Sequence, residues 1–141
     1  MSESKSISLF TKAIQIDKSG EKNEIEFFVE GNYILKNDHV YITYKESEIS
    51  GMEGTTTTLK ITPSSLNILR FGAYNSNLEF RGNEATLTNY QTPYGSIPII
   101  INTTLLEIDL RQGEKSNIHL KYILETEGEE PLNNEVIISY K

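Results

Sequence analysis

The stretch Leu106-Glu107-Ile108-Asp109-Leu110-Arg111 shows most clearly how this chain folds, because apolar and charged residues alternate strictly along it. Successive side chains of a β-strand point to opposite faces, so the pattern predicts one face on a core and the other in water. The same spacing of two recurs in four further stretches, Ile25 to Val29, Val40 to Tyr44, Ile118 to Leu124 and Val136 to Tyr140. Each is predicted to be a half-buried strand.

Composition extends this prediction to the whole chain. Eighteen Ile and thirteen Thr against three Ala favour strands over helices, because β-branched side chains lose rotamer freedom in a helix and pack well on a pleated sheet. Turn-forming residues such as Lys18-Ser19-Gly20, Arg81-Gly82-Asn83 and Gln112-Gly113 divide the apolar runs at short intervals. About ten strands in a sequential antiparallel meander follow.

The predicted fold is all-β, a single closed or nearly closed antiparallel up-and-down β-barrel of about eight to ten strands over residues 1–141. We prefer a barrel to a sandwich because closure removes the exposed sheet edges. A length of 141 residues matches one domain.

Charge and cysteine content narrow the function classes. Thirteen Lys and Arg against twenty Asp and Glu give a net charge of −7, which disfavours nucleic acid and an anionic membrane surface as partners. The absence of Cys excludes disulfides, thiolate nucleophiles and sulfur-ligated zinc. The first ten residues lack the apolar run of a signal peptide, so the expected location is the cytoplasm.

Catalytic motifs are missing, since the chain contains no G-x-S-x-G elbow, phosphate loop, G-x-G-x-x-G or H-E-x-x-H. His39 and His119 have no carboxylates at a spacing typical of a metal site, and both are interpreted as surface residues. We therefore predict no catalytic residue, no metal and no cofactor.

Two charged residues continue apolar strand faces. Glu46 is in phase with Val40, Ile42 and Tyr44, and Arg70 is in phase with Leu66 and Ile68, so both are predicted to point inward. In a purely structural interpretation, the two side chains neutralise each other or lie in water at the barrel mouth. In the functional alternative they anchor a small polar ligand, and the planar guanidinium of Arg70 is suited to binding a carboxylate or phosphate group on it.

Two loops add candidates for binding. The turn Ser50 to Gly54 leads into Thr55-Thr56-Thr57-Thr58, whose hydroxyls either line a polar entrance or simply suit a strand. The turn Thr92-Pro93-Tyr94-Gly95 is expected to lift Tyr94 to the surface as a packing lid. The candidate ligand-binding residues are Tyr44, Glu46, Thr57, Arg70 and Tyr94.

Several motifs in a fixed order give the chain a family resemblance. They are Gly31-Asn32-Tyr33 before Val40 to Glu46, Gly51-Met52 before the Thr-rich strand, Leu69-Arg70-Phe71-Gly72, and Thr92-Pro93-Tyr94-Gly95 with Thr103 after it. In these the chain resembles the small bacterial β-barrel proteins of the YwiB type, a calycin-like domain of unknown function. The resemblance implies a lipocalin-like up-and-down barrel and no established activity. Lys45-Glu46-Ser47 lacks the second acid expected beside Glu46, which disfavours a site built on two carboxylates.

The leading hypothesis for function is a cytoplasmic barrel that binds a small polar or amphipathic molecule inside or at its mouth. The alternative is a structural or protein-interaction module with a side-chain-filled barrel, for which a homodimer is one form. An enzyme comes third, because it would need carboxylate or Tyr chemistry that leaves no sequence signature.

Overall fold

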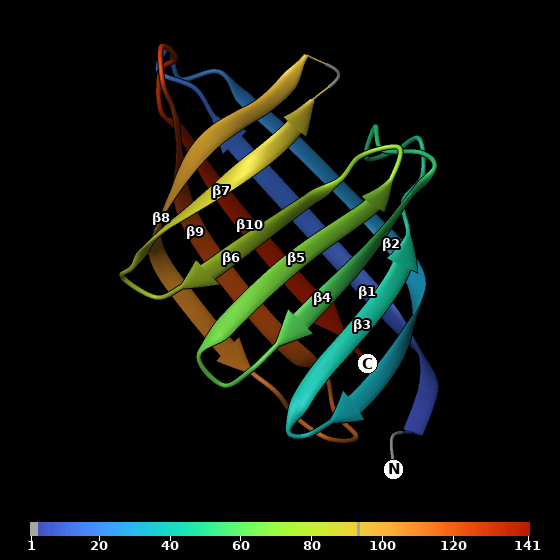
Figure 1. Cartoon of the computed structure of the whole chain (residues 1–141). Helices are drawn as coiled ribbons and strands as arrows, with labels where there is room; N and C mark the ends of the chain where they lie inside the picture. The colour runs from blue at the N-terminus through green and yellow to red at the C-terminus, as the bar shows by residue number, and fades with distance from the viewer. Residues whose placement is uncertain (1–2, 93) are drawn as a thin grey trace.

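The computed structural model describes residues 3–92 and 94–141, which form ten β-strands (Figure 1). In chain order they are β1 (Glu3–Ile16), β2 (Lys22–Lys36), β3 (His39–Lys45), β4 (Thr55–Ile61), β5 (Ser65–Gly72), β6 (Ser76–Arg81), β7 (Ala85–Thr92), β8 (Gly95–Asp109), β9 (Ser116–Thr126) and β10 (Leu132–Tyr140). Pro93, on which one predicted turn depends, lies outside the described residues. Within those residues no helix is long and apolar enough to cross a bilayer.

The strands form one antiparallel sheet in the order β6-β5-β4-β3-β2-β1-β10-β9-β8-β7. Neighbours in sequence are neighbours in the sheet, and β10 pairs with β1 to join the two halves of the meander. The sheet curls until its two edge strands, β6 and β7, lie beside each other (Figure 1). The predicted nearly closed up-and-down barrel is confirmed.

The seam between β6 and β7 is closed by side chains rather than by a ladder. Thr86 Oγ1 donates to the carbonyl oxygen of Glu79 at 2.7 Å, and Thr88 Oγ1 donates to that of Asn77 at 2.8 Å. These hydroxyls satisfy two edge carbonyls that a neighbouring strand would otherwise occupy. The strands therefore surround the core completely, but within the described residues no backbone ladder joins the two neighbouring strands at the β6–β7 seam.

The core consists of the inward rows that the period of two predicts. Its buried apolar members include Leu9, Ile42, Leu59, Ile61, Leu66, Phe80, Ile101, Ile118, Leu120 and Ile138. In β8 a bulge between Thr103 and Leu105 shifts the register, so that Ile101 and Thr103 before it and Leu106 and Ile108 after it all face inward.

The strand predicted from the alternation at 106–111 is confirmed for most of its length, but the prediction is wrong at its last apolar residue. Leu106 and Ile108 pack against the core, but β8 ends at Asp109 and Leu110 is exposed. The chain leaves the sheet there because residues 110–115 form the turn into β9, in which Gly113 has a φ of 74°.

His119 lies on the outer face of β9, as its phase predicts. Its Nε2 lies 2.5 Å from Glu135 Oε2 on β10, and its Nδ1 lies 3.8 Å from Glu107 Oε1 on β8. The carboxylates absent from the local sequence thus come from neighbouring strands. In the part of the chain that the structure describes, no group of three or more potential ligands is arranged to hold a metal.

Candidate functional site

Tyr44, Thr57 and Arg70 form one row across three neighbouring strands. Tyr44 on β3 is opposite Thr57 on β4, and Thr57 is opposite Arg70 on β5. Residues opposite each other in a sheet present their side chains to the same face, here the barrel interior. The register therefore brings together three candidates that are far apart in the sequence.

Glu46 joins this row from just beyond the end of β3. Its backbone N–H donates to the carbonyl oxygen of Thr55 at 2.9 Å, which continues the β3–β4 pairing for one more residue. The phase of the strand is thereby kept, and the Glu46 side chain points inward with only 1% of its surface exposed. The inward direction predicted for Glu46 and Arg70 is what the structure has.

The Glu46 carboxylate is only half satisfied. Thr57 Oγ1 donates a hydrogen bond to Oε2 at 2.5 Å, and Arg70 Nε lies 3.9 Å from the same oxygen. That separation allows Coulomb attraction but is too long for a hydrogen bond. Glu46 Oε1 and Arg70 Nε are buried with no hydrogen-bond partner. Both groups have therefore lost water without gaining a full set of partners.

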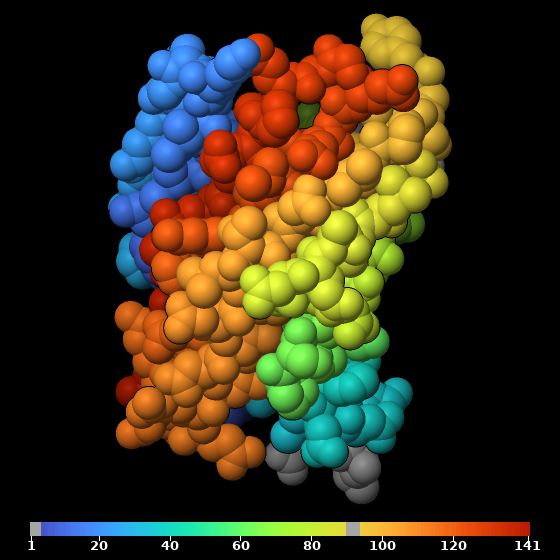
Figure 2. All heavy atoms as spheres, turned by 90° about the vertical axis from the view of Figure 1, so that its left-hand side faces the viewer, coloured from blue at the N-terminus to red at the C-terminus, as the bar shows by residue number. Residues whose placement is uncertain are grey.

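A cavity of about 130 Å³ lies beside this pair, toward the end of the barrel that holds the β3–β4 loop, which is at the top in Figure 1. Its walls are mainly apolar, and Ser50 and Met52 from the loop between β3 and β4 complete the lining. The polar groups in it include Glu46, Arg70 and Thr11, whose Oγ1 is also buried without a partner. Figure 2 shows a small opening at this end of the molecule, among the orange-red atoms around the β9–β10 turn.

Two tyrosines border the same cavity. Burial raises the pKa of the Tyr44 hydroxyl well above its usual value, and the negative charge of Glu46 raises it further while Arg70 opposes the shift. Burial likewise raises the pKa of Tyr122, again opposed by Arg70. A tyrosine hydroxyl is protonated at neutral pH even without such a shift, so both groups are hydrogen-bond donors there.

The remaining candidate, Tyr94, lies apart from this group. It is fully exposed in the turn between β7 and β8 and does not line the cavity. Sequence reasoning missed Thr11, Phe27 and Tyr122, although each is in phase with an inward row. The alternation predicts that these side chains face inward. It does not predict at which height along the barrel axis the inward side chains leave a cavity.

Three comparisons relate the chain to known proteins. A family model described as Domain of unknown function (DUF1934) matches residues 10–138. The chain is 26% identical over 141 residues to the uncharacterized beta-barrel protein YwiB of Bacillus subtilis (strain 168), covering 100% of this chain and 96% of that protein. The crystal structure of the ywiB protein from Bacillus subtilis superposes with a TM-score of 0.84 at 25% identity, covering 98% of this chain and 92% of the other. The resemblance identified from the motifs is confirmed.

Proposed function

The chain belongs to the family described as Domain of unknown function (DUF1934), and we propose that it is a binding barrel that holds one small amphipathic molecule in its interior. The ligand lies in the cavity beside Glu46 and Arg70, with its polar end toward that pair. As part of the same proposal the barrel resembles calycins in binding its ligand in the interior rather than on the outer face. The proposed location of the protein is the cytoplasm.

One observation carries the proposal: Glu46 Oε1 and Arg70 Nε are buried, lack hydrogen-bond partners and border one cavity. A buried carboxylate oxygen without a donor costs roughly 1–3 kcal/mol or more. A ligand that donates to Glu46 and accepts from Arg70 removes this cost. It needs no net charge, because the two side chains already balance each other.

The size and walls of the cavity define the rest of the molecule. An apolar protein cavity of about 150 Å³ holds one benzene molecule, so the 130 Å³ here corresponds to a ligand of about six non-hydrogen atoms. Ile25, Phe27 and Met52 are among the apolar residues around it. The ligand class is therefore a neutral group with both a donor and an acceptor, such as a primary amide, on a short hydrocarbon tail.

Titration with butyramide, followed by NMR of the methyl groups, tests the proposal. We expect shifts at Met52 and Ile68, which line the cavity, and much weaker effects from butyrate or butylammonium, because each carries an uncompensated charge. Glu46→Gln is expected to weaken binding by about tenfold, since the ligand then donates to a neutral amide oxygen instead of a carboxylate and the charge of Arg70 is left unpaired.

Glu48→Gln is the matched control, because Glu48 is an exposed acid in the same loop. Thr11→Val removes another unpartnered cavity hydroxyl and serves as a second test if Glu46→Gln does not fold. Methyl groups that do not respond to butyramide in the folded protein, or equal binding by the Glu46 and Glu48 variants, would overturn the proposal.

A further inference from the structure

The opposite end of the barrel holds a second and larger cavity, which we call the lower mouth. It has a volume of about 560 Å³ and is lined by residues of β1, β2, β10 and the turn between β8 and β9. It shares no lining residue with the cavity beside Glu46. Its volume lies within the range typical of small-molecule sites.

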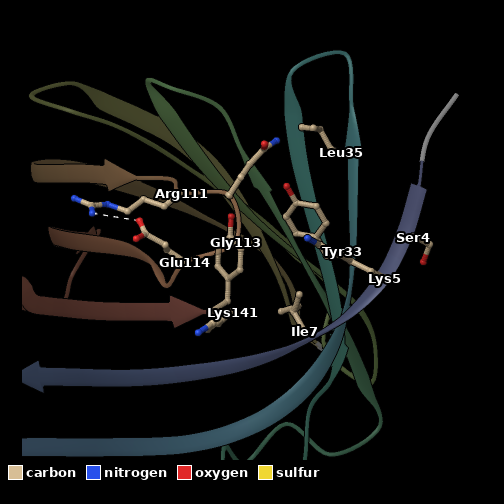
Figure 3. Close-up of a pocket in the computed structure, with 11 residues that line it drawn as sticks. Ser4, Lys5, Ile7, Tyr33, Leu35, Arg111, Gly113, Glu114 and Lys141 are labelled. Atoms are coloured by element: carbon tan, nitrogen blue, oxygen red, sulfur yellow. Dashed lines mark ion pairs between the residues drawn. The ribbon is translucent and has the colours of Figure 1, made fainter.

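An inward row of β1 places a cation in this mouth. Lys5 is in phase with the buried residues Ile7 and Leu9, and in the β1–β2 register it is opposite Tyr33. Its Nζ lies 4.8 Å from the centroid of the Tyr33 ring, within cation–π range. Figure 3 shows the Lys5 side chain ending beside the Tyr33 ring, with Ile7 below and Arg111 across the mouth.

Two aromatic rings give the lower mouth an apolar surface. The rings of Tyr33 and Tyr140 are 5.9 Å apart between centroids and tilted by 42°. Tyr140 is 7% exposed, and Ile7 is 5% exposed. Burial raises the pKa of Tyr140 above its ordinary value of 10.0. Its hydroxyl is a donor at neutral pH, as that of any protonated tyrosine is. A flat ligand ring can pack against these side chains in the tilted or offset arrangements that aromatic groups prefer.

The charges around the lower mouth are mostly positive on a chain whose net charge is −7. Among the side chains that line it, those of Lys5, Arg111 and Lys141 are positive and that of Glu114 is negative. Glu114 pairs with Arg111 at 3.6 Å, and Asp109 pairs with the same guanidinium at 3.2 Å (Figure 3 shows the Glu114 pair). Two carboxylates thus face one guanidinium, so Arg111 has no positive charge left over for a ligand. Among the described residues no carboxylate forms an ion pair with Lys5 or Lys141. Of these two cations, Lys5 is the one whose ammonium lies beside the Tyr33 ring, so it is the one placed to meet a ligand packed on that ring.

We propose that the lower mouth is a second binding site and that it takes an aromatic carboxylate. The ring of the ligand packs on Tyr33 and Tyr140, and its carboxylate accepts a charge-assisted hydrogen bond from Lys5. Lys5 sets the preference for an anion, and the paired rings set the preference for a flat body.

Isothermal titration with 2-naphthoate tests this assignment, with 2-naphthamide and 2-naphthylmethylammonium as neutral and cationic analogues of the same shape. We expect 2-naphthoate to bind most tightly and to shift the NMR signals of the Tyr33 and Tyr140 rings. Lys5→Gln is expected to weaken 2-naphthoate by about tenfold, the usual effect of losing one charge-assisted hydrogen bond, and to leave 2-naphthamide nearly unchanged.

Lys60→Gln is the matched control, because Lys60 lies on the outward-facing row of β4. This substitution removes the same charge at a place outside the lower mouth. Tyr33→Leu is a second variant that removes a ring without changing the charge. Absence of binding, equal affinity for the cationic analogue, equal loss in the Lys5 and Lys60 variants, or shifts confined to the cavity beside Glu46 would each overturn the proposal.

Discussion

Replacing Arg70 by Met probes the buried charge pair, because Met keeps most of the volume of the side chain and removes only its charge and donors. Glu46 then remains in the interior with the hydrogen bond from Thr57 but without its paired cation. Breaking a buried pair from one side is more damaging than removing both partners, since the remaining charge is left without compensation. We therefore predict that Arg70→Met is less stable than the double variant Glu46→Gln/Arg70→Met.

The geometry sets the size of this effect. Two unit charges at 3.9 Å attract by about 4 kcal/mol at an effective dielectric constant of about 20. Arg70 keeps 21% of its side chain exposed, so water screens part of this attraction. We expect a loss of about 2 kcal/mol in the free energy of unfolding, which for 141 residues lowers Tm by about 7 °C. The double variant should recover at least about half of that loss.

Urea unfolding followed by far-UV circular dichroism measures the four free energies of the cycle at constant pH. Tyr122→Phe is a useful control, since it alters a neighbouring cavity hydroxyl without changing any charge. An Arg70→Met protein as stable as the parent, or a double variant that loses the full sum of the single effects, would show that the two side chains do not interact as the structure implies.

Three further predictions concern the frame around the cavities. Thr88→Val should lower stability by about 1 kcal/mol and speed amide exchange in β6, because the carbonyl of Asn77 loses its donor; Thr56→Val, on the outer row of β4, should do neither. Gly72→Ala should lower Tm more than Gly20→Ala, because both residues have positive φ (124° and 88°) but only at Gly72 does the new methyl group collide with the Gly54 carbonyl. The hydrogen bond from His119 lowers the pKa of Glu135 below its ordinary value of 4.5, a stabilising effect present above that pH and lost as the pH falls through the lowered pKa. The Tm advantage of the parent over Glu135→Gln should therefore shrink between pH 6 and pH 3, and a constant difference would contradict this reading.

The strands and their facing were predictable because they depend on a local rule. Alternation with a period of two identifies the inward rows of β3, β9 and β10, and the strand facing follows there without any knowledge of neighbours. The same rule predicted the inward direction of Glu46. In β5 both faces are apolar, since Leu69 and Phe71 lie on the face opposite Leu66 and Ile68, so the sequence indicated the inward direction of Arg70 less sharply. It was wrong at Leu110, where the turn into β9 begins before the alternation ends.

Long-range features were less accessible to sequence reasoning. The bulge between Thr103 and Leu105, the two threonine hydrogen bonds that close the seam and the contact of His119 with carboxylates on two other strands all depend on register. The cavities depend on side-chain size at matching heights of several strands. The sequence alone does not distinguish Lys5 from an ordinary surface lysine. Its contact with Tyr33 depends on the β1–β2 register, which places the two residues opposite each other.

Native mass spectrometry of the gently purified protein tests the central claim most directly. A barrel that holds a small amphipathic molecule beside Glu46 and Arg70 should carry extra mass that disappears on denaturation. That mass should be retained in Glu48→Gln and absent from folded Glu46→Gln/Arg70→Met. A parent protein whose mass matches its sequence alone, together with a cavity filled only by ordered water in a crystal structure, would contradict the account.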